Sequence, residues 1–219
     1  MKRPLILIVL LLFTACASTP PSGQVPEHGA RYLTASWYGP KFHGRPTSSG
    51  ERFDMHGLTA AHKTLNFGTK LRVTNPDTDR SVIVTVNDRG PFIRGRDLDL
   101  SYGAAKEIGL VEKGVGKVKV EHVGRDMRYV KRVPYLPRKE PGPGAYTIQV
   151  GSFTERSNAF RLKEGLEFKY DNVYVTTILL RGKRYYRVKV GKFDNYENTY
   201  SIAEKLADEG YVTLITSMN

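Results

Sequence analysis

The chain has few of the residues that would fix a disulfide-bonded, metal-bound or membrane-spanning fold. Cysteine occurs once, at Cys16, so no intramolecular disulfide can form. The longest apolar run covers residues 5–13, whereas a transmembrane helix needs about 20 apolar residues. No two histidines have the spacing with which a helix binds a metal. The sequence therefore predicts no spanning helix, no metal and no cofactor.

The N-terminal segment is typical of a secretory signal, with Lys2 and Arg3 before the apolar run and small residues after it. Residues 12–16, Leu-Phe-Thr-Ala-Cys, resemble a bacterial lipoprotein processing site, although Phe13 replaces the usual aliphatic residue. This resemblance implies a signal peptide over 1–15, an acylated Cys16, and a tether over 16–30 rich in Pro, Ser and Gly. The alternative is an ordinary cleaved signal in which Cys16 has no role.

Acylation of Cys16 would anchor the chain, because each buried methylene contributes about 0.8 kcal/mol and two or more acyl chains hold stably. Ala17, and not an aspartate, follows the cysteine. The resemblance to Gram-negative lipoproteins therefore implies that the protein is sorted to the outer membrane and faces the periplasm. The formal charge of +12 falls to +10 when Lys2 and Arg3 are removed, which favours an anionic partner. Export excludes nucleic acid, so anionic lipid or an acidic wall polymer remains, unless the charge serves solubility alone.

Two domains are predicted on either side of a basic linker at residues 124–144. This linker alternates Lys and Arg with proline; proline interrupts regular structure, and like charges extend a chain. The expected domains cover residues 31–123 and 145–217.

The first domain is predicted to consist mainly of short strands. Residues 69–74 and 81–87 look like two strands joined by a turn at 75–79. Val82, Val84 and Val86 alternate with neighbours that are also largely apolar, which fits a barrel wall packed inside and partly covered outside. A helical pattern over 101–110, with Ser101 as its N-cap, and a strand over 116–123 complete a compact barrel.

An internal repeat marks the second domain. Val-Gly-Ser-Phe at 150–153 recurs as Val-Gly-Lys-Phe at 190–193, and helical stretches follow at 155–167 and 195–209. With strands at 146–153, 173–180, 186–193 and 211–216 the order is βαββαβ, the ferredoxin-like or RNP-like pattern. Two helices would then cover one face of a four-stranded sheet and leave the other face open.

Strand alternation assigns side chains to the two faces of this sheet. The residues expected to face the helices are Ile148, Val150, Val188 and Val190. The open face would carry Thr147, Gln149, Tyr185, Arg187 and Lys189. An aromatic ring with amide and cationic donors suits a sugar chain or single-stranded RNA, and export argues against RNA. The alternative is a plain solvated sheet face.

Four motifs run through the first domain: Ser36-Trp37-Tyr38-Gly39, Gly50-Glu51-Arg52-Phe53-Asp54, Leu58-Thr59-Ala60-Ala61-His62 and Asn87-Asp88-Arg89-Gly90-Pro91-Phe92. Together they resemble the rare lipoprotein A family, and the repeat of the second domain resembles a SPOR domain. The resemblance covers nearly all of the mature chain except tether and linker. It implies a mainly β plus α+β fold, a six-stranded double-psi β-barrel followed by a small SPOR domain.

The resemblance also implies an endolytic peptidoglycan transglycosylase, a lyase of the periplasm that works at the division septum. Such enzymes cleave the β-1,4 bond between N-acetylmuramic acid (MurNAc) and N-acetylglucosamine (GlcNAc) without water. The muramyl 6-hydroxyl attacks its own anomeric carbon and leaves a 1,6-anhydro end. SPOR domains recognise glycan strands that lack stem peptides, and proteins of the divisome are expected as further partners.

The resemblance and this chemistry select Asp88, Glu51 and His62 as catalytic residues. One carboxylic acid can protonate the leaving oxygen and then accept the 6-hydroxyl proton, whereas hydrolases use two carboxylates. Asp88 follows a strand end and is the first choice; Glu51 would stabilise charge on the sugar or assist proton transfer, and His62 would orient Asp88 or share its proton. The predicted substrate-binding residues are Tyr38 and Arg89, with Gln149, Tyr185, Arg187 and Lys189 on the sheet.

Other readings of these residues stay open. An acid catalyst should not pair with a cation, so Arg89 is expected to point away from Asp88. Asp88 is also typical of a turn residue that bonds its own backbone, and His62 of a buried barrel histidine. The main alternative function is a glycan-binding, wall-organising protein without turnover, since a fold does not fix a function. A hydrolase that uses Asp88 and Glu51 as acid and base is the third.

Overall fold

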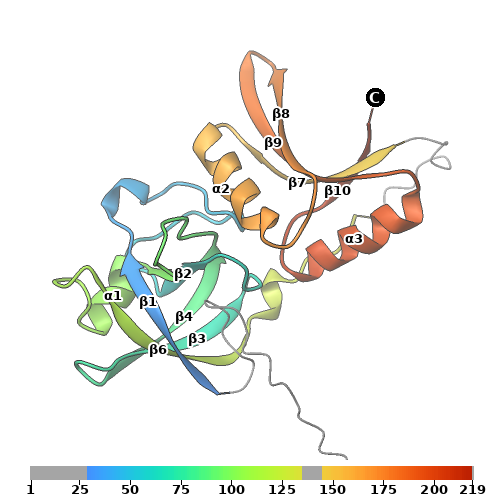
Figure 1. Ribbon diagram of the computed structural model, residues 1–219. Helices are drawn as coiled ribbons and strands as arrows, with labels where there is room; N and C mark the ends of the chain where they lie inside the picture. Colours follow the sequence, from blue (N-terminus) through green and yellow to red (C-terminus); the bar gives the residue numbers. More distant parts are fainter. Residues whose placement is uncertain (1–28, 135–144, 219) are drawn as a thin grey trace, which may run out of the picture.

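The computed structural model describes residues 29–134 and 145–218, which form two β-rich units that pack against each other (Figure 1). The expected signal peptide, Cys16, nearly all of the tether and residues 135–144 of the expected linker lie outside the described residues. Within the described ranges, no helix combines the length and the apolar character needed to cross a membrane.

The first unit, within residues 30–125, is a closed barrel of six strands. They are β1 (Ala30–Trp37), β2 (Thr59–His62), β3 (Thr69–Asn75), β4 (Arg80–Asp88), β5 (Leu98–Leu100) and β6 (Val115–Arg125). Around the barrel the order is β1-β5-β2-β4-β3-β6, and the pairs β1–β5 and β2–β4 are parallel. The prediction of a six-stranded barrel is confirmed.

Alternating apolar side chains fill the barrel. Val82, Val84 and Val86 on β4 point inward and are buried, as their spacing predicts. Ile83 on the outer face is 48% exposed, because the strand pleat turns its side chain toward solvent. Helix α1 (Tyr102–Glu107) begins at the expected cap, because Ser101 Oγ accepts the N–H of Ala104 at 3.2 Å.

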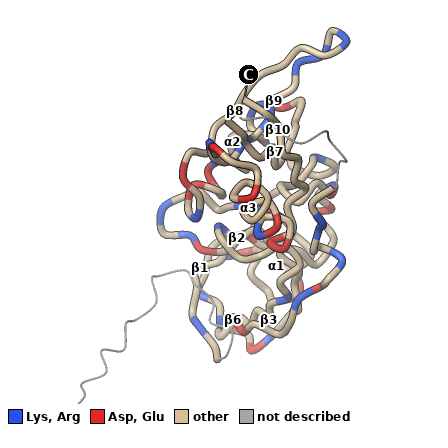
Figure 2. Tube along the Cα trace, turned by 90° about the vertical axis from the view of Figure 1, so that its right-hand side faces the viewer, with Lys and Arg blue, Asp and Glu red and all other residues tan. Residues whose placement is uncertain are grey.

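The second unit contains β7 (Tyr146–Phe153), α2 (Arg156–Glu167), β8 (Val173–Leu180), β9 (Lys183–Phe193), α3 (Tyr196–Asp208) and β10 (Leu214–Ser217). Its sheet order is β10-β7-β9-β8, with α2 and α3 on one face, which confirms the βαββαβ pattern (Figure 1). The four residues expected beneath the helices are all buried in this core. Beyond β7, β8 and β9 continue as a hairpin with a cationic turn at Arg181 and Lys183 (Figure 2).

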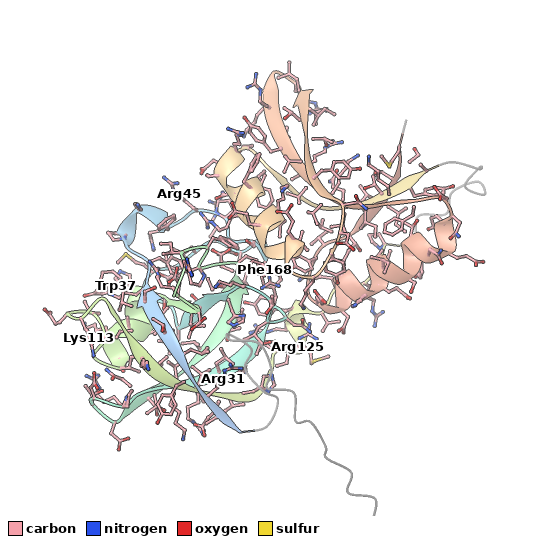
Figure 3. The ribbon with its side chains drawn as sticks, viewed as in Figure 1. Arg31, Trp37, Arg45, Lys113, Arg125 and Phe168 are labelled. Carbon is pink, nitrogen blue, oxygen red and sulfur yellow. The ribbon has the colours of Figure 1, made fainter. Side chains whose placement is uncertain are left out.

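A packed boundary joins the two units. Phe67, from the connection between β2 and β3, is fully buried in the core of the second unit. Its N–H donates to the carbonyl of Glu209 at 3.0 Å. Two ion pairs flank this contact, Arg45–Glu155 at 3.6 Å and Arg125–Asp208 at 3.5 Å. Figure 3 shows Arg45, Phe168 and Arg125 along the boundary.

The first part of the expected linker belongs to this boundary. β6 continues to Arg125, and a 3₁₀ turn, η2 (Met127–Tyr129), follows it. Tyr129 and Val133 pack against the second core, and the N–H of Lys131 donates to the carbonyl of Ala207 at 2.8 Å. An extended spacer was expected from charge and proline, but the apolar residues between the cations have partners on the second unit.

Candidate active site

One cleft of about 420 Å³ brings together residues from three of the four motifs. It lies between the loop after β1, the end of β4 with its following loop, and helix α2. Trp37, the single tryptophan of the chain, lines the cleft, and its Nε1 donates to the carbonyl of Val111 at 3.3 Å. Tyr38 and Asp88 line it from the barrel, and Arg161 lines it from α2.

Asp88 is the last residue of β4, and its side chain is 4% exposed. It pairs with Ala61 of the parallel strand β2, after a bulge that re-aims the strand end. Oδ1 accepts the backbone N–H groups of Ser48 and Arg89, each at 2.8 Å. Oδ2 accepts Nη1 of Arg161 at 3.3 Å. Oδ1 of Asp88 is therefore used by backbone N–H groups, one of them in its own turn. Oδ2 faces helix α2 across the cleft.

The other carboxylate lining the cleft, Asp99, is engaged within the barrel, where it accepts from Ser36 and Arg96. Tyr38 stacks on Phe53 with ring centroids 4.2 Å apart. Burial raises the pKa of Tyr38 well above its ordinary value, and the negative charges of Asp88 and Asp99 raise it further. The cleft therefore contains a neutral phenol beside Asp88.

Glu51 lies in a separate pocket of about 120 Å³, with Tyr129 and Lys131. Its Oε2 accepts Nδ2 of Asn87 at 2.9 Å and the hydroxyl of Tyr129 at 2.6 Å. Burial, and then the carboxylate of Glu51, raise the pKa of Tyr129 above its ordinary value. Because Asn87 precedes Asp88, Glu51 is connected to Asp88 through one intermediate residue and does not share its cleft.

His62 ends β2, beside the Ala61–Asp88 pair, and is 2% exposed. Its Nδ1 accepts the N–H groups of Thr64 at 3.2 Å and Leu65 at 3.1 Å, which places the proton of a neutral imidazole on Nε2. It is not among the described residues that line the cleft, so its role in orienting Asp88 stays a prediction. No group of three or more potential metal ligands occurs in the described part of the chain.

Arg89 points away from Asp88, as expected, and it is among the residues that line the cleft, so its predicted role in binding substrate stays a prediction. Arg89 is 1% exposed, and its guanidinium lies between the two units. Nε donates to the hydroxyl of Tyr211 at 2.8 Å, and Cζ lies 3.8 Å from the ring centroid of Phe67. A guanidinium held in this way bridges the barrel to the second unit, because Phe67 and Tyr211 come from different units.

Two residues of the site were not predicted from the sequence, Arg161 and Tyr129. Arginine is common on exposed helix faces, and Tyr129 lay in the expected linker. One signal was present: a glycine inside a helical pattern often marks close packing, and Gly165 lies one turn after Arg161. A Cβ added to Gly165 would lie 2.8 Å from Cδ of Arg89.

A second cleft of about 530 Å³ adjoins the first, because both are lined by Phe92 and Ile93. Phe168, which follows α2, lines its far side at the domain boundary and is 57% exposed (Figure 3). Exposed apolar side chains in a hollow between domains commonly mark a ligand groove.

The residues predicted for the open sheet face lie together, away from both clefts. Lys189 is opposite Gln149 and Tyr174, and Arg187 follows on the same face. Tyr185 lies farther along β9, in the hairpin. Partial burial, and then the charge of Arg187, lower the pKa of Lys189. Thr147 is covered, because the hydroxyl of Tyr174 donates to its Oγ1 at 3.0 Å.

Comparisons with known proteins agree with this architecture. Residues 31–120 match the family described as "Lytic transglycolase", and residues 142–215 match the SPOR domain. The chain is 38% identical over 177 residues to endolytic peptidoglycan transglycosylase RlpA of Vibrio cholerae, an alignment that covers 81% of this chain and 65% of that protein. To the protein of the same name from Pseudomonas aeruginosa it is 43% identical over 134 residues, 61% of this chain and 39% of the relative.

The chain thus spans 65% and 39% of the length of these two relatives. Among solved structures, apo expansin from Clavibacter michiganensis aligns with 87% of this chain and 92% of its own, at 14% identity and a TM-score of 0.35. The two matched domains occur in the order that the motifs imply. The chain belongs to the rare lipoprotein A (RlpA) family, with a double-psi β-barrel domain followed by a SPOR domain.

Proposed function

We propose that this chain is an endolytic transglycosylase of peptidoglycan in which Asp88 acts as both acid and base. The main support is the position of Asp88. Of the two carboxylates among the described residues that line the cleft, Asp99 is held by barrel side chains, whereas Asp88 presents Oδ2 to the cleft side. The names of the relatives, which are endolytic peptidoglycan transglycosylases, support the same reaction.

In this reaction protonated Asp88 gives its proton to the oxygen between MurNAc and GlcNAc as the bond from that oxygen to C1 breaks. The muramyl 6-hydroxyl then forms its bond to C1, and its proton returns to Asp88. Atoms balance without water, and the product ends in a 1,6-anhydro ring. One carboxylic acid suffices for this sequence, whereas inverting and retaining hydrolases place two carboxyl groups about the same bond. Glu51, in its separate pocket, is poorly placed for such a pair.

The remaining site residues support Asp88. Glu51 acts through Asn87, which holds the strand end that carries Asp88. His62 acts through the end of β2 that pairs with this strand end. Tyr38, a neutral phenol, donates or accepts a hydrogen bond with a sugar hydroxyl.

We further propose a place and a substrate form for this activity. Acylation at Cys16 anchors the chain to the outer membrane, facing the periplasm, and the SPOR domain brings it to strands without stem peptides at the division septum. The supports are the leader motif and the cationic sheet face of Gln149, Tyr185, Arg187 and Lys189, which matches the free carboxylates of such strands. Divisome proteins are candidate partners.

One observation favours the alternative of a glycan-binding protein without turnover. Asp88 is nearly buried and is paired with Arg161, so the arrangement described here keeps the acid from a substrate. The same cleft would then bind a strand without cleaving it.

Cleavage and its products distinguish these functions. Peptide-free glycan strands are incubated with the protein that lacks its signal peptide, and the products are identified by mass. We expect 1,6-anhydro ends from the wild type and a loss of at least about a thousandfold in rate for Asp88→Asn, since the acid is removed. Reducing ends would instead identify a hydrolase, and binding without cleavage a wall-organising protein.

The control variant is Asp54→Asn, which alters an exposed carboxylate of the same domain beside His43. It should retain wild-type activity. Full activity of Asp88→Asn would disprove the assignment of Asp88.

A further inference from the structure

The second domain contributes a side chain to the reacting carboxyl group. Oδ1 of Asp88 is occupied by two backbone N–H groups, so Oδ2 is the atom left to carry a proton. Arg161 Nη1 lies 3.3 Å from this atom, and the Asp88 side chain is 4% exposed. A glycosidic oxygen must come within about 2.6–3.2 Å to receive a proton. Arg161 therefore has to leave Oδ2 before Asp88 can act.

The packing of α2 on the barrel places the backbone of Arg161 at the cleft, while its side chain can turn. Arg161 and Gly165 are four residues apart and so lie on the same face of the helix. Gly165 packs directly on Arg89, which is enclosed by Phe67 and Tyr211. Arg161 also lies over the ring of Phe42, 5.4 Å from its centroid. The cation is thus held at the cleft by elements of both domains.

When Arg161 leaves the carboxylate of Asp88, its guanidinium needs another negatively charged partner. Among the described residues that line the cleft, the only other carboxylate is Asp99, which already accepts from Ser36 and Arg96. A neutral sugar offers no counter-charge, and a half-buried cation that loses its counter-ion is strongly disfavoured. A carboxylate on the substrate can accept two parallel N–H bonds from a guanidinium, the strong geometry for this pair.

We infer that Arg161 of the SPOR domain is a specificity-determining residue that selects strands whose muramyl lactyl group is a free carboxylate. On binding, Arg161 moves from Oδ2 of Asp88 to the substrate carboxylate, and Oδ2 becomes available for the proton of the reaction. A stem peptide converts the lactyl carboxylate to a neutral amide, which cannot form an ion pair with Arg161. This inference rests on the proposed function, because it assigns the substrate form that the same cleft accepts.

Matched strands test the inference by activity. One preparation keeps free lactyl carboxylates, and the other has them converted to neutral methylamides. We expect the wild type to prefer the free carboxylates by at least about tenfold in kcat/KM, and Arg161→Gln to bring the ratio near one. Arg161→Lys should keep part of the preference. Arg156→Gln, the same change on an exposed residue of the same helix, should keep all of it.

A binding measurement separates this inference from the proposed activity. Fluorescence of Trp37 reports on the cleft alone, because it is the single tryptophan and lines it. Short MurNAc–GlcNAc oligosaccharides, free or methylamidated, are titrated into Asp88→Asn and into Asp88→Asn/Arg161→Gln. A preference for the free acid that disappears with Arg161 supports the inference even if the wild type cleaves nothing. The same preference in both proteins would overturn it.

Discussion

At the scale of single residues, Tyr129 is the side chain that connects Glu51 to the domain boundary. Its hydroxyl lies 2.6 Å from Glu51 Oε2, while its ring packs against the second core. Tyr129→Phe removes the donor and keeps the ring. We expect kcat to fall about threefold to tenfold. The unfolding free energy should change by at most about 1 kcal/mol, because Glu51 is exposed and water can replace the lost donor. Steady-state rates and urea unfolding measure the two effects.

Tyr32→Phe is the matched control, because Tyr32 is 62% exposed on β1 and remote from Glu51. Unchanged kcat in Tyr129→Phe, together with a large loss in Glu51→Gln, would show that Glu51 works without this hydrogen bond.

The sequence predicted residue types and turns better than it predicted the destinations of long side chains. Asp88 lies where its turn motif indicated, because the turn and the end of β4 are local features. Arg89 is different, since its partner Tyr211 is 122 residues away in the chain. Nothing near Arg89 specifies that partner, and the same holds for Arg161 and Asp88. The pairing of Asp88 with a cation of another domain was therefore beyond sequence reasoning.

At the scale of elements, α2 is the helix by which the second domain meets the barrel. Gly165→Ala in such a helix would normally add about 1 kcal/mol of stability. Here the new Cβ would lie 2.8 Å from Arg89 Cδ and 2.9 Å from its Cγ, and Arg89 is enclosed on both sides. We expect a net loss of about 1–3 kcal/mol in unfolding free energy, measured by urea titration.

Ser157→Ala controls for the effect on the helix itself, because Ser157 is exposed in the first turn of α2. It should change stability by no more than about 0.5 kcal/mol. A gain in stability for Gly165→Ala would mean that α2 does not press on Arg89 in solution.

Element prediction succeeded where a pattern was long enough to show a period. β3, β4, β6 and the six elements of the second domain follow apolar spacings of 2 or 3.6 residues, and their bounds shift by only a few residues. β2 has four residues and β5 has three, too few for a period, and β1 was given no bounds from its pattern. Parallel pairs such as β2–β4 depend on distant segments. These strands came from the family resemblance alone.

At the scale of the whole molecule, the boundary between the domains is built from residues that belong to both of them. Phe67 belongs to the barrel by sequence and to the second core by contact, and Arg89 is enclosed by residues of both domains. The composition of residues 124–144 predicted a semi-rigid linker that separates the two domains, whereas residues 127–133 pack at the boundary between them. We therefore expect the barrel and the SPOR domain to unfold together.

Phe67→Ala tests this coupling. The side chain is fully buried, and its removal should cost about 3–5 kcal/mol, mostly from the boundary. We expect calorimetry to show one transition for the wild type, with equal calorimetric and van't Hoff enthalpies, and two transitions for Phe67→Ala. Phe168→Ala is the control, because Phe168 lies at the same boundary but is 57% exposed.

The coupling has a consequence for the reaction. Once Phe67 no longer joins the domains, α2 is not held on the barrel and Arg161 is not held on Asp88. Phe67→Ala should therefore lose its single calorimetric transition. At a temperature where both domains remain folded, it should also lose the preference for free lactyl carboxylates. A variant that unfolds in two steps yet keeps the full preference would show that the preference arises within the barrel. A single transition would show that other boundary contacts suffice to couple the domains.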